Sequence, residues 1–187
     1  MIEKLDCWHF ASNDLRFGYY DHREIIAGES LRVDAAPVLC EFGLHGSERL
    51  IDALKYAPGN MLCRVTLSDG LIIGDDKAVA RDRYTHWIFD AENALRDFAA
   101  TVAENALLAE RAAGREPDPR SWAAVKFVRD LLAGKIRQED VAAAWSAAWS
   151  AADSAARSSA WSSAESSAES DQNYLLMQIL KKHGAPI

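Results

Sequence analysis

The sequence predicts an α+β protein, in which a small, mostly antiparallel sheet with one short helix is followed by an all-helical C-terminal lobe. Two observations predict this division. Residues 1–89 contain short apolar or alternating segments separated by Gly, Asp, Asn or Pro, as is typical of strands. Residues 90–187 contain periodic apolar stripes and then an Ala/Ser-rich repeat, as is typical of helices. We therefore expect an α+β domain at 1–89 and a helical lobe at 90–187.

Five segments of the first domain are expected to be strands: 4–10, 36–42, 60–67, 70–76 and 78–89. One helix interrupts them, with Ser47 as its predicted N-cap and an apolar stripe that continues to Ala57. Ser68-Asp69-Gly70 predicts a tight turn that joins two strands directly. A short helix on a small antiparallel sheet is the simplest arrangement of these elements.

Two further helices are expected next along the chain. Asp90 is the predicted N-cap of the first, whose apolar stripe contains Leu95, Phe98, Val102 and Ala106. Gly114 and two prolines then break the chain, and the second helix is expected to start at Ser121 and to end near Gly134. From there the composition favours helix almost to His183.

A four-residue repeat occupies about residues 141–170. It places Trp or a charged residue at every fourth position, namely Trp145, Trp149, Asp153, Arg157, Trp161, Glu165 and Glu169. Four residues turn an α-helix through about 400°, so the row drifts by roughly 40° per repeat and winds around the axis. This drift excludes a heptad coiled coil and leaves two solutions, one long helix or shorter helices that fold back.

The last helical segment is amphipathic, with lysines and His183 near its C-terminal end. It either folds back onto the protein or binds another chain. For the second case the candidate partner-binding residues are Trp161, Tyr174, Leu176, Ile179 and Leu180. The alternative is that the whole tail is scaffold.

Composition and charge limit the classes of function. The 187 residues have a net charge of −7, which argues against broad binding of a nucleic-acid backbone. No signal peptide opens the chain and no apolar run approaches the roughly 18 residues of a membrane span, so a cytoplasmic protein is expected. The three cysteines include no CxxC pair, so we expect reduced thiols in the core.

Several motifs together resemble a family of phage and prophage proteins of unknown function. They are "LDCWHF", "GLHGSERLIDALKYAPGNMLCRV" (43–65), "GDDKAVARDR" (74–83) and the Trp-studded alanine-rich tail. The resemblance covers nearly the whole chain and implies a location in the bacterial cytosol during infection or lysogeny. It supplies no catalytic residues. The chain departs from the family pattern in Gly46, where Ala is usual, and in the many serines of its tail.

His9, His45 and Tyr56 are the candidate catalytic residues of an alternative interpretation. Their setting is similar to the way ADP-ribosyltransferase folds arrange groups that contact NAD, where a histidine holds the ribose and an aromatic ring stacks on nicotinamide. The catalytic glutamate of such sites has no counterpart, because no Glu follows Val65 before Glu92. The competing interpretation is that both histidines are structural.

The sequence contains residues that are suited to two further kinds of site, for zinc and for anions. Zinc ligands are available in principle, since Cys7 and His9 share a strand face and Cys40, His45 and Cys63 lie in nearby segments. Only the first pair is closely spaced, so no metal site is expected. A separate hypothesis concerns anions, because Arg81 and Arg83 alternate on one strand face and are candidate anion-binding residues.

These observations favour a phage or prophage accessory protein that binds a host or defence-system protein, as a counter-defence inhibitor or adaptor, without a cofactor. The alternative is an ADP-ribosyltransferase-like enzyme that uses NAD. A third possibility is a virion or assembly component whose tail self-associates.

Overall fold

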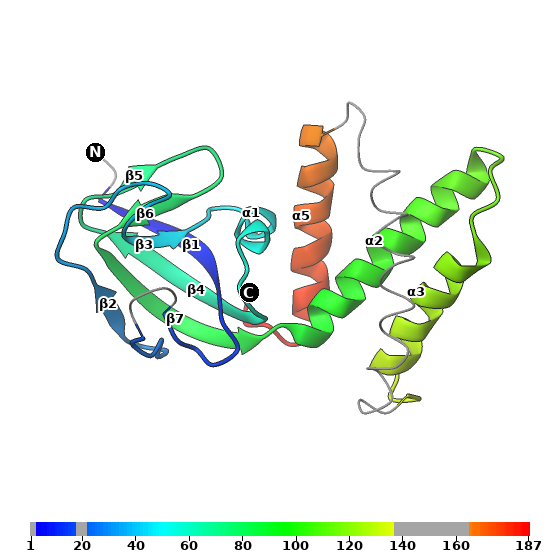
Figure 1. Ribbon diagram of the computed structural model, residues 1–187, viewed down its shortest axis with the longest axis horizontal. Coiled ribbons are helices and arrows are strands. Elements are labelled where there is room, and N and C mark those ends of the chain that lie inside the picture. The colour runs from blue at the N-terminus through cyan, green and yellow to red at the C-terminus, as the bar shows by residue number, and fades with distance from the viewer. Residues whose placement is uncertain (1–2, 18–21, 137–164) are drawn as a thin grey trace. The chain divides into compact units, whose positions relative to one another are not determined.

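Strands are the main regular elements in the first part of the chain in the computed structural model, which describes residues 3–17, 22–136 and 165–187. The strands are β1 (Lys4–Ala11), β2 (Ser30–Arg32), β3 (Leu44–Gly46), β4 (Met61–Ser68), β5 (Ile72–Ile73), β6 (Ala78–Ala80) and β7 (Asp82–Asp90). They form two sheets with the orders β1-β4-β7-β2 and β3-β6-β5, and every strand pairing described is antiparallel (Figure 1). Antiparallel strands combined with helices confirm the predicted α+β class, although two sheets replace the expected single one.

The four-stranded sheet has one face that is turned toward the core. His9 lies opposite Cys63 in the β1–β4 pairing, and Leu67 lies opposite Arg83 in the β4–β7 pairing. Because side chains alternate along a strand, these four share the inner face. The buried cluster on this side contains Cys7, Ala11, Ile25, Cys63, Val65, Leu67, Ala78 and Ala80. Two strands of the first sheet and β6 of the second therefore contribute to one core.

The two sheets are joined at two points. Trp8 and Ser47 exchange backbone hydrogen bonds with N···O distances of 2.8 and 2.9 Å, which brings β3 beside β1. Arg81 is the single residue between β6 and β7, so the chain passes directly from one sheet into the other. The sheets approach closely at Gly46, where an added Cβ would lie 2.8 Å from the Cβ of Cys7. This closeness explains why a residue without a side chain fits there.

Two sequence predictions in this region are wrong. Ser47 does not cap α1 (Leu50–Lys55): Arg49 is its N-cap residue, and the Ser47 backbone is engaged with Trp8. Residues 36–42 do not form a strand, because the chain reverses at Cys40, which has a φ of 70°. Val38 and Phe42 pair only with each other across this reversal. The predicted turn at Asp69 and Gly70 is present, with φ angles of 62° and 69°, but it joins strands of different sheets.

The chain divides into two units, the first comprising Met1–Glu92 with Gln172–Ile187 and the second comprising Asn93–Asp171. The second unit contains most of α2 (Glu92–Ala112) and all of α3 (Pro119–Leu132). The Asp90 carboxylate accepts a hydrogen bond from the Glu92 N–H at 3.0 Å, as expected for the predicted N-cap. The second helix begins at Pro119 instead of Ser121, because Asp118 caps it by accepting from the Arg120 N–H at 2.8 Å.

Arg129 connects α3 with α2. One of its terminal nitrogens, Nη1, donates to the buried Asp97 carboxylate. The other, Nη2, lies 2.9 Å from both Thr101 Oγ1 and a Glu104 carboxylate oxygen. All three partners are on α2, so a single guanidinium links α3 to it.

The second half of α5 (Glu165–Lys182) belongs to the first unit and corrects the prediction of an all-helical C-terminal lobe. The Asn173 side-chain oxygen accepts from the Ile51 N–H at 3.0 Å, which ties α5 to α1. Three predicted partner-binding residues, Leu176, Ile179 and Leu180, are buried. They are therefore unavailable to another chain in this fold.

The remaining predictions concern the C-terminal tail and membrane-spanning segments. Tyr174 is 66% exposed and remains accessible. Trp161 and most of the repeat at 141–170 lie outside the described residues, so the predicted winding of the repeat stays a prediction. Among the helices that the structure describes, none has both the length and the apolar character to cross a membrane.

Candidate functional site

A buried arginine on β7 is the most unusual polar group of the first unit. Arg83 is fully buried, and its Nη1 donates to the backbone oxygen of His45 at 3.1 Å. Its Nε and Nη2 atoms have no hydrogen-bond partner within the described part of the chain. The ring centre of Phe17 lies 5.5 Å from the guanidinium carbon. Burial lowers the pKa of Arg83 to about 10, which still leaves it cationic at neutral pH.

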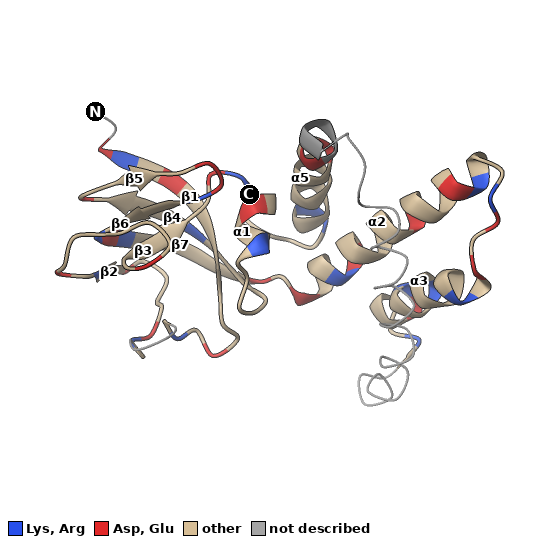
Figure 2. Cartoon of the chain, turned by 45° about the horizontal axis from the view of Figure 1, so that its top comes forward, with Lys and Arg blue, Asp and Glu red and all other residues tan. Residues whose placement is uncertain are grey.

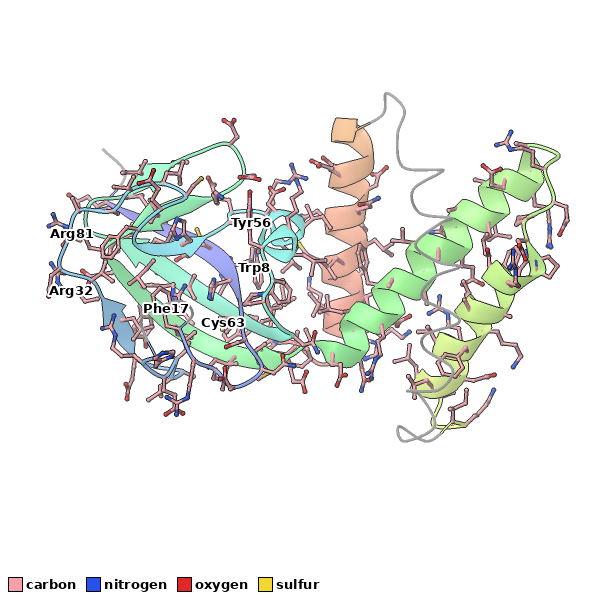
Figure 3. The ribbon with its side chains drawn as sticks, viewed as in Figure 1. Trp8, Phe17, Arg32, Tyr56, Cys63 and Arg81 are labelled. Carbon is pink, nitrogen blue, oxygen red and sulfur yellow. The ribbon has the colours of Figure 1, made fainter. Side chains whose placement is uncertain are left out.

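His9 lies on the same inner face as Arg83. Burial, together with the Arg83 guanidinium and His45, lowers the pKa of His9 well below its ordinary value. The imidazole is therefore neutral at pH 7 and has one N–H donor and one acceptor nitrogen. Cys63 of β4 is paired with His9 of β1, and Phe17 comes from the segment after β1 (Figure 3).

The cysteines differ sharply in their surroundings. Burial raises the pKa of Cys7 to about 12 and that of Cys63 to about 11, so both are neutral thiols at pH 7. Cys40 is exposed, away from that face. Within residues 3–17, 22–136 and 165–187, no three His, Cys, Asp or Glu side chains are arranged to hold a metal ion.

The other two candidate catalytic residues lie in a polar cluster at the surface. The Tyr56 hydroxyl donates to the Asp76 carboxylate at 2.6 Å, and the Lys77 ammonium lies 4.0 Å from the Tyr56 ring centre. His45 Nε2 accepts from the Cys40 N–H at 3.3 Å, while burial and the nearby Lys77 lower the pKa of His45. His9, which is paired with Cys63, thus shares the inner face of the sheet. The half-exposed Tyr56 instead lies beside α1 (Figure 3).

The outer face of the four-stranded sheet carries an open groove with a volume of about 620 Å³. It is lined by Lys4, Leu5, Asp6, Ser30, Thr66, Ser68, Tyr84 and His86. Thr66 Oγ1 lies 2.5 Å from an Asp6 oxygen and 2.7 Å from His86 Nε2. In a nucleophile–base relay the carboxylate orients the histidine, but here both groups contact the hydroxyl directly. The groove therefore presents a hydrogen-bonded polar surface without the geometry of a catalytic triad.

An apolar surface lies at the free edge of the second sheet. We name Val38, Phe42, Ile72 and Ile73 the β5 patch; their exposed fractions are 45, 43, 40 and 45%. The 38–42 turn approaches the end of β5, because a Cβ added to Gly74, directly after β5, would lie 2.7 Å from the Leu39 side chain. In the described residues β5 pairs on one side only, with β6. Sequence analysis missed this patch, although two adjacent isoleucines between glycines are an available signal.

The two predicted anion-binding arginines lie in different surroundings. Arg83 faces the core, as described above. Arg81 lies between the two strands and is partly exposed, and its Nε atom also has no partner among the described residues (Figure 3). Arg83 has two unpartnered nitrogens among the described residues and Arg81 has one, so Arg83 is the stronger candidate for binding an anion. Phe17 lies beside Arg83, which the sequence did not indicate.

Comparisons with protein-family models, curated proteins and solved structures give no match for this chain. The resemblance to the phage and prophage family therefore stays a prediction. The bacterial cytoplasmic location that depends on this resemblance stays a prediction as well.

Proposed function

We propose that the chain is a phage or prophage accessory protein that acts by binding a host or defence-system protein, and that the β5 patch is its contact surface. The observation that carries this proposal is the exposure of Ile72 and Ile73 on an edge strand, together with Val38 and Phe42 in the 38–42 turn, whose Leu39 approaches Gly74 directly after that strand. Exposed apolar residues that occur singly need no explanation, whereas a group of them favours an interaction site.

The edge strand adds backbone groups to this apolar surface. An unpaired strand offers a row of N–H and C=O groups to an extended segment of another protein, and neighbouring side chains then supply specificity. Ile72 and Ile73 are adjacent on β5, so they point to opposite faces of the strand, and both are exposed. An added strand would therefore bury apolar area on both of its faces. We infer that the partner presents an extended apolar segment.

Charge and burial favour this surface over the alternatives. Basic and acidic residues are interspersed along the described elements (Figure 2), which argues against a nucleic-acid backbone as the partner. The C-terminal helix offers Tyr174, but its Leu176, Ile179 and Leu180 are buried. We therefore propose the contact surface on the first unit, in preference to the C-terminal helix.

A pull-down from a bacterial lysate, followed by mass spectrometry, tests the proposal on the full chain. The patch variant carries Phe42→Ser and Ile73→Ser, and the matched control carries Leu108→Ser and Tyr174→Ser, two residues that are also exposed. We expect one protein to be retained by the wild type and the control but lost from the patch variant. Loss from the control alone would move the contact surface to the helices, and equal retention by all three would refute the patch.

The tail could also be tested by truncating the chain at Gly134, but the truncated protein would not be a suitable comparison for the full chain. The truncation removes residues 172–187, which belong to the first unit, and with them the buried Leu176 and Leu180. Loss of binding would then report damage to the fold. Point substitutions at exposed positions avoid this problem.

The second candidate function is an ADP-ribosyltransferase-like enzyme that uses NAD. The observation that favours it is the placement of His9 beside a buried arginine with unpartnered N–H groups. A mass search for ADP-ribose on co-expressed bacterial proteins tests it, with His9→Ala as the comparison. Modification that disappears in the variant supports the enzyme, and no modification with the wild type refutes it.

A further inference from the structure

Arg83 carries a positive charge in the core, and the described residues give it no neutralising partner. No carboxylate of the described residues contacts it, and its one hydrogen bond goes to a neutral backbone oxygen. Buried charges in proteins are normally paired, because removing an ion from water costs several kcal/mol. Its ionisable neighbours include His9 and His45, whose pKa values are both lowered, and Cys63, which is a protonated thiol. The surroundings thus supply no negative charge.

The two unpartnered nitrogens have a specific geometry. Nε and Nη2 lie on one edge of the planar guanidinium, and their N–H bonds point in nearly the same direction. This edge matches two oxygens of a phosphate or a carboxylate in a bidentate pair. The remaining nitrogen, Nη1, is held by the His45 oxygen at 3.1 Å, which fixes the orientation of the fork.

We propose that Arg83 binds the anionic group of a small ligand through this fork, inside the first unit. The shared chemistry is that of a phosphate or carboxylate group. Phe17, whose ring centre lies 5.5 Å from the guanidinium carbon, provides an aromatic surface beside the anion. This site is separate from the β5 patch and goes beyond the proposed partner binding.

Thermal unfolding of the full chain with added anions tests the site. The probes are inorganic phosphate, acetate and NAD, each compared with chloride at the same ionic strength. With phosphate at 10 to 100 times its Kd, the Tm of the wild type is expected to rise by roughly 3–10 °C. A rise with acetate alone would assign a carboxylate ligand, and a rise at much lower concentrations of NAD would assign a phosphate-bearing nucleotide.

Variants separate Arg83 from other basic groups. Arg83→Met should abolish the response, while Arg81→Met should keep it. An unchanged response in Arg83→Met, or no response of the wild type to any of the three probes, would overturn the proposal.

A second measurement covers the case in which Arg83→Met does not fold. In wild-type protein labelled with ¹⁵N-arginine, the Arg83 Nε–H resonance should shift saturably with phosphate, acetate or NAD. This resonance can be assigned with Arg83→Lys, which keeps the charge but removes the fork. If the only side-chain resonances that shift belong to exposed arginines, the site does not exist.

Discussion

The C-terminal helix provides the sharpest test of how the chain is organised. Leu180 is fully buried in the second half of α5, so Leu180→Ala removes apolar contacts from the interior. Leu→Ala substitutions at buried sites reduce the free energy of unfolding by about 2–5 kcal/mol. We take about 3 kcal/mol, because a terminal helix can shift to fill part of the cavity. At about 1.4 kcal/mol per tenfold change, this loss corresponds to a roughly 100-fold larger open population.

Hydrogen exchange of the β4 amides measures this effect, since β4 is the strand between β1 and β7 in the first unit. Leu180→Ala should lower their protection by roughly 100-fold. Tyr174→Ala is the matched control on the same helix, and its 66% exposure predicts a change within about 0.5 kcal/mol. Unchanged β4 protection in Leu180→Ala would refute the assignment of α5 to the first unit and restore it as a binding arm.

Three further predictions concern the core of the first unit. Gly46→Ala should lower the Tm by several degrees, because the new Cβ would lie 2.8 Å from the Cβ of Cys7; a Tm at or above that of the wild type would contradict the close approach. Iodoacetamide at pH 8 should label Cys40 alone in the native protein, because burial raises the pKa of Cys7 to about 12 and that of Cys63 to about 11; mass spectrometry of peptides checks this. The free energy of unfolding should fall as the pH drops below about 6.5, because the unfolded chain takes up a proton at His9 before the native state does; urea titrations should show a smaller pH dependence for His9→Gln, and an equal dependence would exclude His9 as the cause.

Local patterns in the sequence were sufficient to predict several elements of secondary structure. Alternation of apolar residues predicted β1 and β4, whereas the single strand expected at 78–89 is divided by Arg81 into β6 and β7 of different sheets. The Asp90 carboxylate accepts from the Glu92 N–H at the start of α2, as the predicted N-cap would. These features depend on neighbours in the sequence, so no knowledge of tertiary contacts is needed. The boundary of α3 was missed by two residues, because Asp118 competes with Ser121 as a cap and lies directly before a favourable Pro119.

Other features depend on contacts between distant segments. An amphipathic helix has the same pattern whether it covers its own sheet or another protein, so Leu176 and Leu180 could not be assigned to the interior from the sequence. Ser47 resembles an N-cap by its position, but pairing with Trp8 uses its backbone differently. Alternation placed Arg83 on a strand face without showing that this face is buried.

The β5 patch as a protein contact is the central claim, and site-specific photo-crosslinking in bacterial cells tests it most directly. A photoreactive amino acid placed at Ile73 should form a covalent adduct with one protein, and the same group at Tyr174 should form none. Both positions are exposed, so the comparison controls for accessibility. An adduct at position 174 with none at 73 would contradict the account and assign recognition to the C-terminal helix, and no adduct at either position would contradict a protein contact at the β5 patch.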